Sequence, residues 1–168
     1  MVERVVVDVQ LALDEISSIE VPENKLIQQW VAAAIEAARN EENQGKNQNT
    51  QMTVRIVDEA EISQFNVNYR HKSGATNVLS FPFVPPPGIP DNEMVHSLGD
   101  LVVCAAVVNK EAKEQHKERS AHWAHIIVHG TLHLMGLDHQ NKKEAYAMES
   151  LETNIMFELG FPDPYREI

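Results

Sequence analysis

The chain has 168 residues, of which 43% are hydrophobic and 23% are charged. These fractions are typical of globular proteins and exclude wholesale disorder, which combines low hydrophobicity with high charge. The length favours a single domain over residues 1–168. The single cysteine, Cys104, excludes an internal disulfide framework and a cysteine-based zinc ribbon.

The charge and apolar patterns also limit where the protein acts. No apolar run approaches the roughly 18 residues that span a bilayer, and the N-terminus lacks the features of a signal peptide. We therefore expect a cytoplasmic protein that does not associate with a membrane. The net charge of −11 argues against a protein that wraps nucleic acid. Residues 62–90 nevertheless contain no Asp or Glu and include Arg70, His71 and Lys72, so a locally cationic surface is compatible with the sequence.

The first half of the chain predicts two strands and two helices. Residues 4–13 are β-branched and apolar and predict a strand. Pro22 and Glu23 suit the first turn of the helix that follows. The polar stretch 40–51, rich in Asn and Gln, predicts a loop. A second strand over 52–57 and a short helix over 58–69 come next.

The second half predicts two more strands and then only helices. The strands cover 76–84 and 99–104, and the first of them is ended by the Pro-rich segment 85–88. Helices are expected over about 105–118, 120–136 and 142–159. This order predicts an α+β fold with a mixed, mostly parallel four-stranded sheet and about five to six helices. A crossover helix between the first two strands favours a parallel pair there.

Five of the eight histidines fall between residues 122 and 139. His129 and His133 are four residues apart, so on a helix they lie one turn apart on the same face. Gly136 suits the left-handed residue that ends a helix, and the turn it makes can bring His139 back to that face. Three imidazoles with an open fourth position are typical of a catalytic zinc site. The alternative is a set of surface histidines on an amphipathic helix, which the third histidine and the glycine make weaker.

The same spacing occurs in the metzincin zinc peptidases, where the residue after the first histidine is a Glu that acts as general base. Here that position is Gly130. A metzincin-like zinc peptidase or amidohydrolase is therefore an alternative function that lacks its base. Restoring a Glu at position 130 should help a peptidase and do little for a nuclease. An all-imidazole site favours Zn²⁺, although other divalent metals such as nickel also bind imidazole.

Five segments from about residue 50 onward form a recognisable set: NYRHK (68–72), TNVLSFPF (76–83), LGDLVVC (98–104), HGTLHLMGLDH (129–139) and MESLETNIMFELGFPDPY (148–165). Together they resemble the bacterial YbeY family. This resemblance implies a metal-dependent, single-strand-specific endoribonuclease that acts in 16S rRNA 3′-end maturation and ribosome quality control. It further implies His129, His133 and His139 as zinc ligands and Arg70 as an arginine tied to activity. The implied partners are single-stranded RNA, the small ribosomal subunit and its assembly proteins.

These residue types suit phosphodiester cleavage. A bound zinc ion lowers the pKa of its water to about 7 and polarises a phosphate oxygen. A guanidinium can clamp two oxygens of the charged transition state, and Arg70 would supply it. The alternative role for Arg70 is a surface salt bridge at the end of the helix over 58–69.

Other residues have two interpretations each. His125 and His122 continue the face of His129, and we expect them to support a ligand, contact RNA or simply belong to the helix. Asp138 either orients a ligand imidazole or caps the turn, and Ser80 either donates to substrate or bonds to the backbone. Three aromatic residues could stack on bases, although at least two of them should pack in the core: Phe65, Phe81 and Phe83. Four acidic residues are expected to form a solvated face of the last helix: Glu144, Glu149, Glu152 and Glu158. A non-catalytic ribosome-assembly factor with a structural zinc is a further alternative function.

Overall fold

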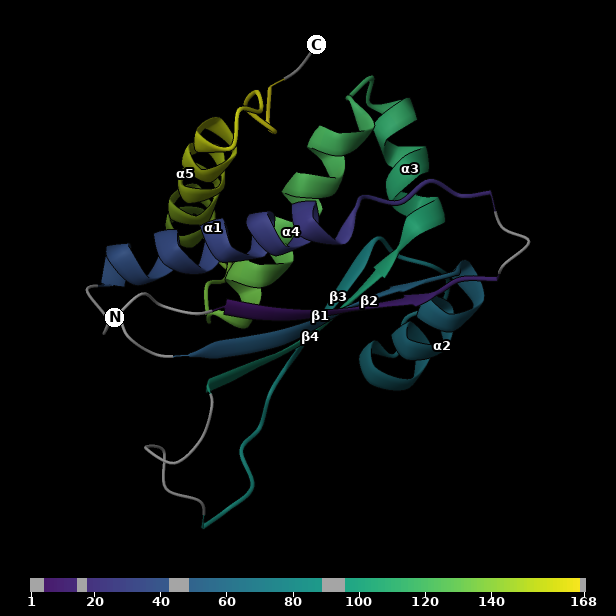
Figure 1. Cartoon of the computed structure of the whole chain (residues 1–168), viewed down its shortest axis with the longest axis horizontal. Helices are drawn as coiled ribbons and strands as arrows, with labels where there is room; N and C mark the ends of the chain where they lie inside the picture. Colours follow the sequence, from purple (N-terminus) through teal and green to yellow (C-terminus); the bar gives the residue numbers. More distant parts are fainter. Residues whose placement is uncertain (1–4, 15–17, 43–48, 89–95, 167–168) are drawn as a thin grey trace.

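The computed structural model describes residues 5–14, 18–42, 49–88 and 96–166. They form four strands and five helices (Figure 1). The elements in chain order are β1 (Val5–Ala12), α1 (Asn24–Glu42), β2 (Thr50–Val57), α2 (Glu59–Arg70), β3 (Val78–Pro82), β4 (His96–Cys104), α3 (Ala105–Glu114), α4 (Arg119–Leu134) and α5 (Lys142–Glu158).

The strands form one sheet in the order β1-β2-β4-β3. The β1–β2 and β2–β4 pairs are parallel, whereas β3 runs antiparallel to β4 at the edge. The α+β fold with a four-stranded sheet, and the parallel first pair, are therefore confirmed. The sheet is better described as mixed than as mostly parallel, because its edge strand β3 runs opposite to β4.

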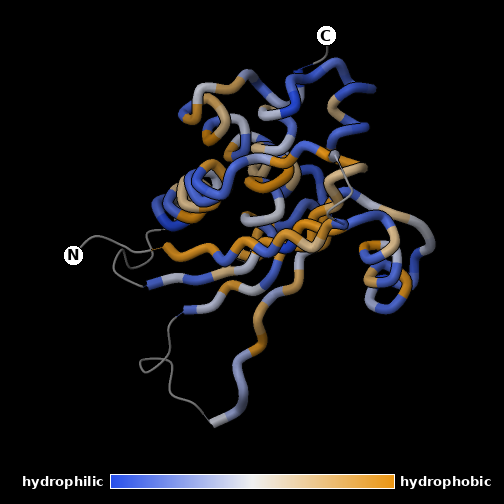
Figure 2. Tube along the Cα trace, turned by 45° about the vertical axis from the view of Figure 1, so that its right-hand side comes forward, coloured by the Kyte–Doolittle hydropathy of each residue, from blue (hydrophilic) through white to orange (hydrophobic). Residues whose placement is uncertain are grey.

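Helices cover the two faces of the sheet unequally. In Figure 1, α1, α3, α4 and α5 lie on one face and α2 lies on the other. The larger core lies under the four helices and includes Trp30, Trp123 and Leu101, all at most 2% exposed. Hydrophobic residues run along the strands in Figure 2, as a sheet packed on both faces requires. The smaller core under α2 contains Cys104, and burial raises the pKa of its thiol.

The predicted boundaries differ from the observed ones mainly at the strands. The strand predicted over 99–104 begins at His96, because pairing with β2 extends through polar residues that apolar patterning misses. The strand predicted over 76–84 is observed as the shorter β3, Val78–Pro82, although Asn77 and Phe83 on either side of it still share one backbone bond each with β4. Half of the loop predicted over 40–51, residues 43–48, lies outside the described residues, whereas α1 extends to Glu42 and β2 begins at Thr50. No described helix is both long and apolar enough to cross a membrane.

Helix α4 is the central element on the face of the sheet that carries four helices. It packs against α1, α3, α5 and strand β3, so its exposed face is confined to one stripe. Gly130 allows its close approach to the sheet, because a Cβ at that position would lie 2.9 Å from the Leu101 Cδ2 atom. A Glu at position 130 would therefore meet β4 rather than solvent. Such a substitution would disturb the helix–sheet packing, so it does not test peptidase chemistry alone.

Candidate metal centre and cleft

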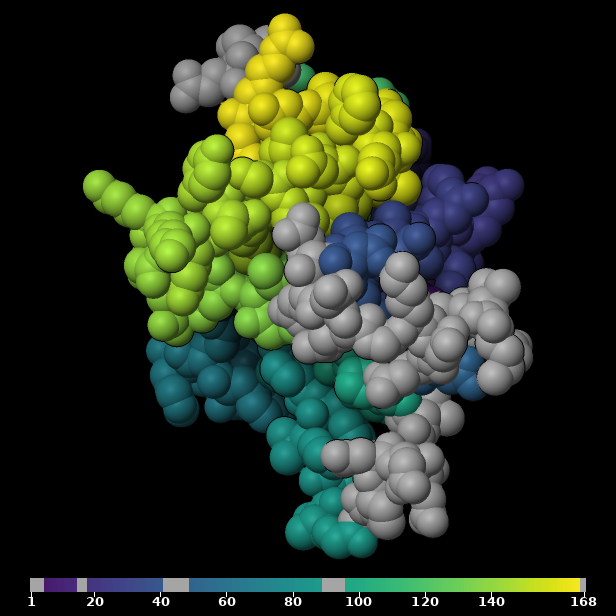
Figure 3. Space-filling model, turned by 90° about the vertical axis from the view of Figure 1, so that its left-hand side faces the viewer, coloured from purple at the N-terminus to yellow at the C-terminus, as the bar shows by residue number. Residues whose placement is uncertain are grey.

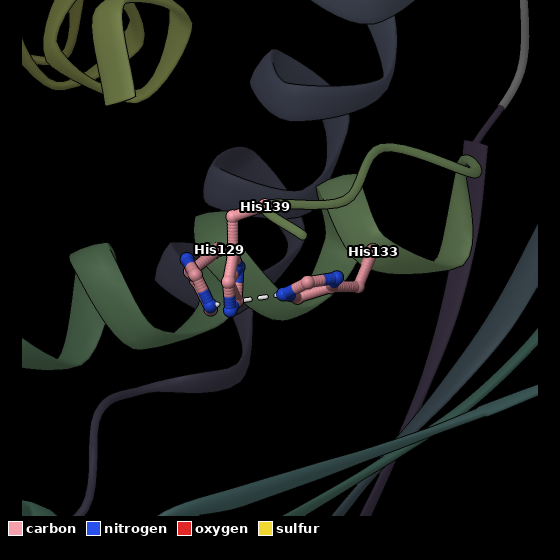
Figure 4. A group of neighbouring side chains, drawn as sticks. All are labelled: His129, His133 and His139. Carbon is pink, nitrogen blue, oxygen red and sulfur yellow. Dashed lines mark hydrogen bonds between the residues drawn. The ribbon is translucent and has the colours of Figure 1, made fainter. Parts of the chain in front are cut away.

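Three histidines meet at the C-terminal end of α4. His129 and His133 project from adjacent turns of the helix, and His139 reaches them from the chain that follows (Figure 4). The ring centroids of His129 and His133 are 4.6 Å apart, and His139 lies 5.8 Å and 5.0 Å from the two. One nitrogen of each ring lies within 4.8 Å of the others. The structure thus brings together the three histidines that the sequence singled out.

The return of His139 depends on how α4 ends. The N–H of Gly136 bonds to the carbonyl of His133, and the N–H of Leu137 bonds to the carbonyl of Leu132, at 3.0 and 3.1 Å. This pair of bonds is the Schellman motif, which requires a left-handed residue just past the helix. Gly136 supplies it with a φ of +96°. The predicted chain reversal at this glycine is confirmed.

The hydrogen bonds of His129 show how the cluster suits a metal ion. Its Nδ1 atom lies 2.5 Å from the Glu152 carboxylate, an acceptor, so Nδ1 carries a proton and donates it to Glu152. Its other nitrogen, Nε2, lies 3.1 Å from Nε2 of His133. Two imidazole nitrogens so close need a proton or a cation between them, and nitrogen ligands about 2 Å from one ion satisfy this distance. The donor set of three imidazoles therefore fits a zinc ion.

The pKa of His133 favours ligation as well. Burial lowers the pKa of His133 below its ordinary value, and the neighbouring rings of His129 and His139 lower it further. The imidazole is therefore neutral at pH 7, which is the form that binds a metal. His139 is exposed at the rim, so the cluster opens to solvent on that side.

Glu152 is the main residue that the sequence interpretation missed. Its side chain is fully buried and accepts hydrogen bonds from His129, from His125 at 3.1 Å and from the Tyr165 hydroxyl at 2.5 Å. Burial would raise the pKa of this carboxyl, but the bonds from His125 and His129 outweigh it, and the pKa falls to about 2. The expected solvated face is thus wrong for Glu152, although the other three acidic residues of α5 are exposed.

The remaining candidates occupy less direct places. His125 does not join the three histidines but bonds through Nε2 to Glu152, and so helps hold the carboxylate that orients His129. Asp138 accepts the backbone N–H of His139 at 2.7 Å, which makes it a cap of the turn. The Ser80 hydroxyl donates to the carbonyl of Gly130 at 3.4 Å, a long bond between β3 and α4. His122 lies one turn further from the cluster, bonded to Glu111 at 3.1 Å.

A cleft of about 1060 Å³ runs between α4 and the edge strand β3, and the three histidines line it. The C-terminal end of α2 contributes Tyr69 and Arg70 to the same cleft, and the chain after α5 contributes Tyr165. Figure 3 shows the face on which the turn after α4 (lime) lies directly above α2 and the residues after it (dark teal). Arg70 is exposed, and within the described residues no carboxylate forms an ion pair with it. The surface salt bridge weighed as its alternative role is not formed there.

Two of the three phenylalanines considered as base platforms are packing residues. Phe65 and Phe81 are partly buried against the smaller core under α2, with ring centroids 5.7 Å apart. Phe83, just beyond β3, is 41% exposed. The expectation that at least two of them pack in the core therefore agrees with the structure.

These features define the class of the protein. It is an α+β protein with a candidate metal centre of three histidines at the end of a helix, and this centre opens to a large cleft. A family model described as endoribonuclease YbeY matches residues 12–160. The chain belongs to the YbeY endoribonuclease family, and this membership supports a metal-dependent endoribonuclease role in rRNA processing. The solution structure of TM1509 from Thermotoga maritima has a similar fold, with a TM-score of 0.54 at 21% identity over 96% of this chain and 99% of that one.

Proposed function

We propose that this protein is a zinc-dependent, single-strand-specific endoribonuclease that acts in 16S rRNA 3′-end maturation and ribosome quality control. The observation that carries the proposal is that Arg70, from α2, lines the same cleft as His129, His133 and His139, from the end of α4. The cleft thus combines three metal-binding side chains with a cation that has no ion-pair partner among the described residues. The proposed partners are single-stranded RNA and the small ribosomal subunit with its assembly proteins, in the cytoplasm.

The roles of the residues follow from their contacts. His129, His133 and His139 would hold the zinc ion, which when bound supplies Lewis-acid polarisation and a lowered pKa for water. Glu152 keeps His129 in the tautomer whose Nε2 lone pair faces the other two rings. Arg70 would bind two non-bridging phosphate oxygens and stabilise the charge that develops during cleavage. Its exposure leaves all of its donors available to a substrate.

The peptidase alternative is weakened at the edge strand. A peptide substrate typically pairs with the free edge of a strand through several backbone bonds. Two backbone bonds fix the pairing of β3 with β4. At one end the N–H of Cys104 donates to the carbonyl of Asn77, and at the other the N–H of Phe83 donates to the carbonyl of Leu98. The backbone groups of Val78, Ser80 and Pro82 therefore point away from β4. The Asn77 side chain already takes the Val78 N–H, and Pro82 has none. Within β3 only Ser80 keeps both a donor and an acceptor for a peptide.

The structural-zinc alternative makes a different prediction for His139. This residue lies on an exposed turn beyond α4, so the His139→Ala substitution removes no core contact. A purely structural metal predicts that this variant loses stability, measured as its melting temperature with and without zinc. The proposed function predicts a folded variant that has lost RNA cleavage.

The decisive experiment measures cleavage of an end-labelled single-stranded RNA by the zinc-loaded protein. A chelated sample and the Arg70→Glu variant should both lose cleavage, the variant by about 100-fold or more, since one transition-state contact is typically worth this much. Lys25→Glu is the matched control, because Lys25 is exposed in the first turn of α1 and does not line the cleft. It carries the same charge reversal and should cleave like the wild type.

Two outcomes would contradict the proposal. Equal cleavage in the zinc-loaded, chelated and Arg70→Glu samples would identify a contaminating nuclease. Loss of cleavage in Lys25→Glu as large as in Arg70→Glu would mean that net charge, rather than a contact in the cleft, governs activity.

A further inference from the structure

Tyr69 stands out among the residues of the cleft because it is both aromatic and open to solvent. It lies in the last turn of α2, immediately before Arg70, and both residues line the cleft of the histidine cluster. Of the residue surface, 64% is exposed. Aromatic side chains usually bury most of their surface, so an exposed ring beside a catalytic cleft needs an explanation other than core packing.

The ring is nevertheless held in place by two neighbours. Phe65, one turn earlier on α2, stacks on it at a centroid distance of 5.9 Å and an interplanar angle of 28°. Phe81 of β3 contacts it at 5.3 Å in a T-shaped arrangement. One face of Tyr69 is therefore covered and its orientation is set, while the outer side remains free. A ring fixed in advance loses little conformational entropy when a ligand stacks on it.

The charge around Tyr69 indicates the kind of ligand. The sequence from 62 to 90 has no acidic residue, and Arg70, His71 and Lys72 follow the tyrosine directly. Tyr69 thus lies where the chain is locally cationic, on a protein whose net charge is −11. An aromatic face beside cationic groups is the combination with which proteins bind single-stranded nucleic acid, where bases stack and phosphates meet positive charge.

We propose that Tyr69 is a stacking platform for an unpaired RNA base next to the phosphate that Arg70 binds. This inference rests on the proposed nuclease function and adds a physical reason for its preference for single strands. A base within a duplex is already stacked on both faces and cannot lie on Tyr69. An unpaired base can do so while the neighbouring phosphate reaches Arg70, which is the next residue in the chain.

The test measures RNA binding separately from cleavage. A short labelled single-stranded RNA is titrated with each protein in the presence of a chelator, and its fluorescence anisotropy gives the Kd. Tyr69→Leu keeps an apolar side chain of similar reach but lacks a ring, and it should weaken binding about tenfold. Tyr69→Phe should bind as the wild type does, since it keeps the ring. Tyr146→Leu is the matched control, because Tyr146 is 75% exposed on α5 and does not line the cleft.

A second RNA identifies the contact as stacking. If abasic sites replace the bases of the oligonucleotide, wild type and Tyr69→Leu should bind it equally weakly. A Tyr69→Leu protein that binds the normal RNA as the wild type does, while the wild type cleaves RNA with zinc, would overturn the platform and leave the nuclease intact. A wild type that neither binds nor cleaves would overturn both proposals and favour a protein partner for this surface. Equal melting temperatures for Tyr69→Leu and Tyr69→Phe exclude misfolding as the cause of a loss.

Discussion

The buried carboxylate of Glu152 and the ring of His129 are joined by a hydrogen bond of 2.5 Å, and the opposite nitrogen of that ring faces His133 at 3.1 Å. The negative charge of Glu152, on the buried face of α5, is thereby linked through the imidazole of His129 to the open histidine cluster. Such a carboxylate raises the basicity of a ligand histidine and fixes its orientation. The position of His129 is therefore set by the packing of α5 on α4 as well as by its own helix.

The Glu152→Gln substitution tests this link. It removes the charge while keeping the size of the side chain, and it should weaken zinc binding about 10- to 100-fold, because partners of ligand histidines typically contribute this much. Competition with a chromophoric chelator measures the affinity. Glu149→Gln, on the exposed side of the same helix, is the control and should bind zinc normally. An unchanged affinity in Glu152→Gln would mean that the carboxylate serves stability only.

The turn after α4 predicts a second effect on the cluster. Gly136→Ala places a Cβ on a residue with a φ of +96°, which should cost about 1–2 kcal/mol of stability. Because the same turn returns His139, zinc affinity should fall as well. Gly160→Ala is a close match, since Gly160 ends α5 with the same pair of backbone bonds and a φ of +89°. Its stability should fall equally, measured by urea unfolding, with a smaller change in zinc affinity.

The close approach of α4 to β4 can be tested with a double-mutant cycle. Gly130→Ala should destabilise the protein by about 1 kcal/mol, since crowding of Leu101 outweighs the helix propensity gained by alanine. In a Leu101→Ala background the crowding is absent, and the same change at position 130 should stabilise the protein. Equal effects in the two backgrounds, measured by denaturant unfolding, would show that the two residues do not compete for space.

The ionisation of Glu111, which lies outside the cluster of His129, His133 and His139, should make the stability of the protein depend on pH. Hydrogen bonding from His122 lowers the pKa of this carboxyl below its ordinary value of 4.5, burial opposes the shift, and Asn77 adds to it. A lowered folded-state pKa means that the ionised group contributes stability above the unfolded pKa and loses it as pH falls through the folded pKa. Glu111→Gln should therefore cost about 1–2 kcal/mol at pH 5.5 and progressively less toward pH 3. A cost that is constant over this range would exclude ionisation as its source.

The difference between what the sequence predicts and what the structure adds lies in the range of the contacts. His129, His133, Gly136 and His139 are close in sequence, so helical spacing and one turn residue suffice to group them. Glu152 joins them only because α5 packs on α4, a contact that no local pattern specifies. One signal was present, since Glu152 shares its helical face with the buried Met148 and Met156. A charged residue on an apolar face is a candidate for a buried partner.

Local apolar patterning predicts edge strand β3 but does not predict the direction in which it runs. Residues 83–95 contain a proline-rich segment that ends the strand without indicating where the chain pairs next. Ser80 of β3 and Arg70 of α2 line one cleft with α4, and this arrangement follows only from the assembled fold.

The blunted outer edge of β3 also bears on how the protein behaves at high concentration. An unpaired strand edge is a template on which another chain can add a strand and begin an aggregate. The Asn77 side chain caps one N–H of this edge, and Pro82 removes a second, so a neighbouring molecule finds only an interrupted ladder. The cleft therefore needs no covering helix along this strand. Two side chains, one in the strand and one beside it, therefore discourage self-association at this edge, and the groove beside the histidines can stay uncovered.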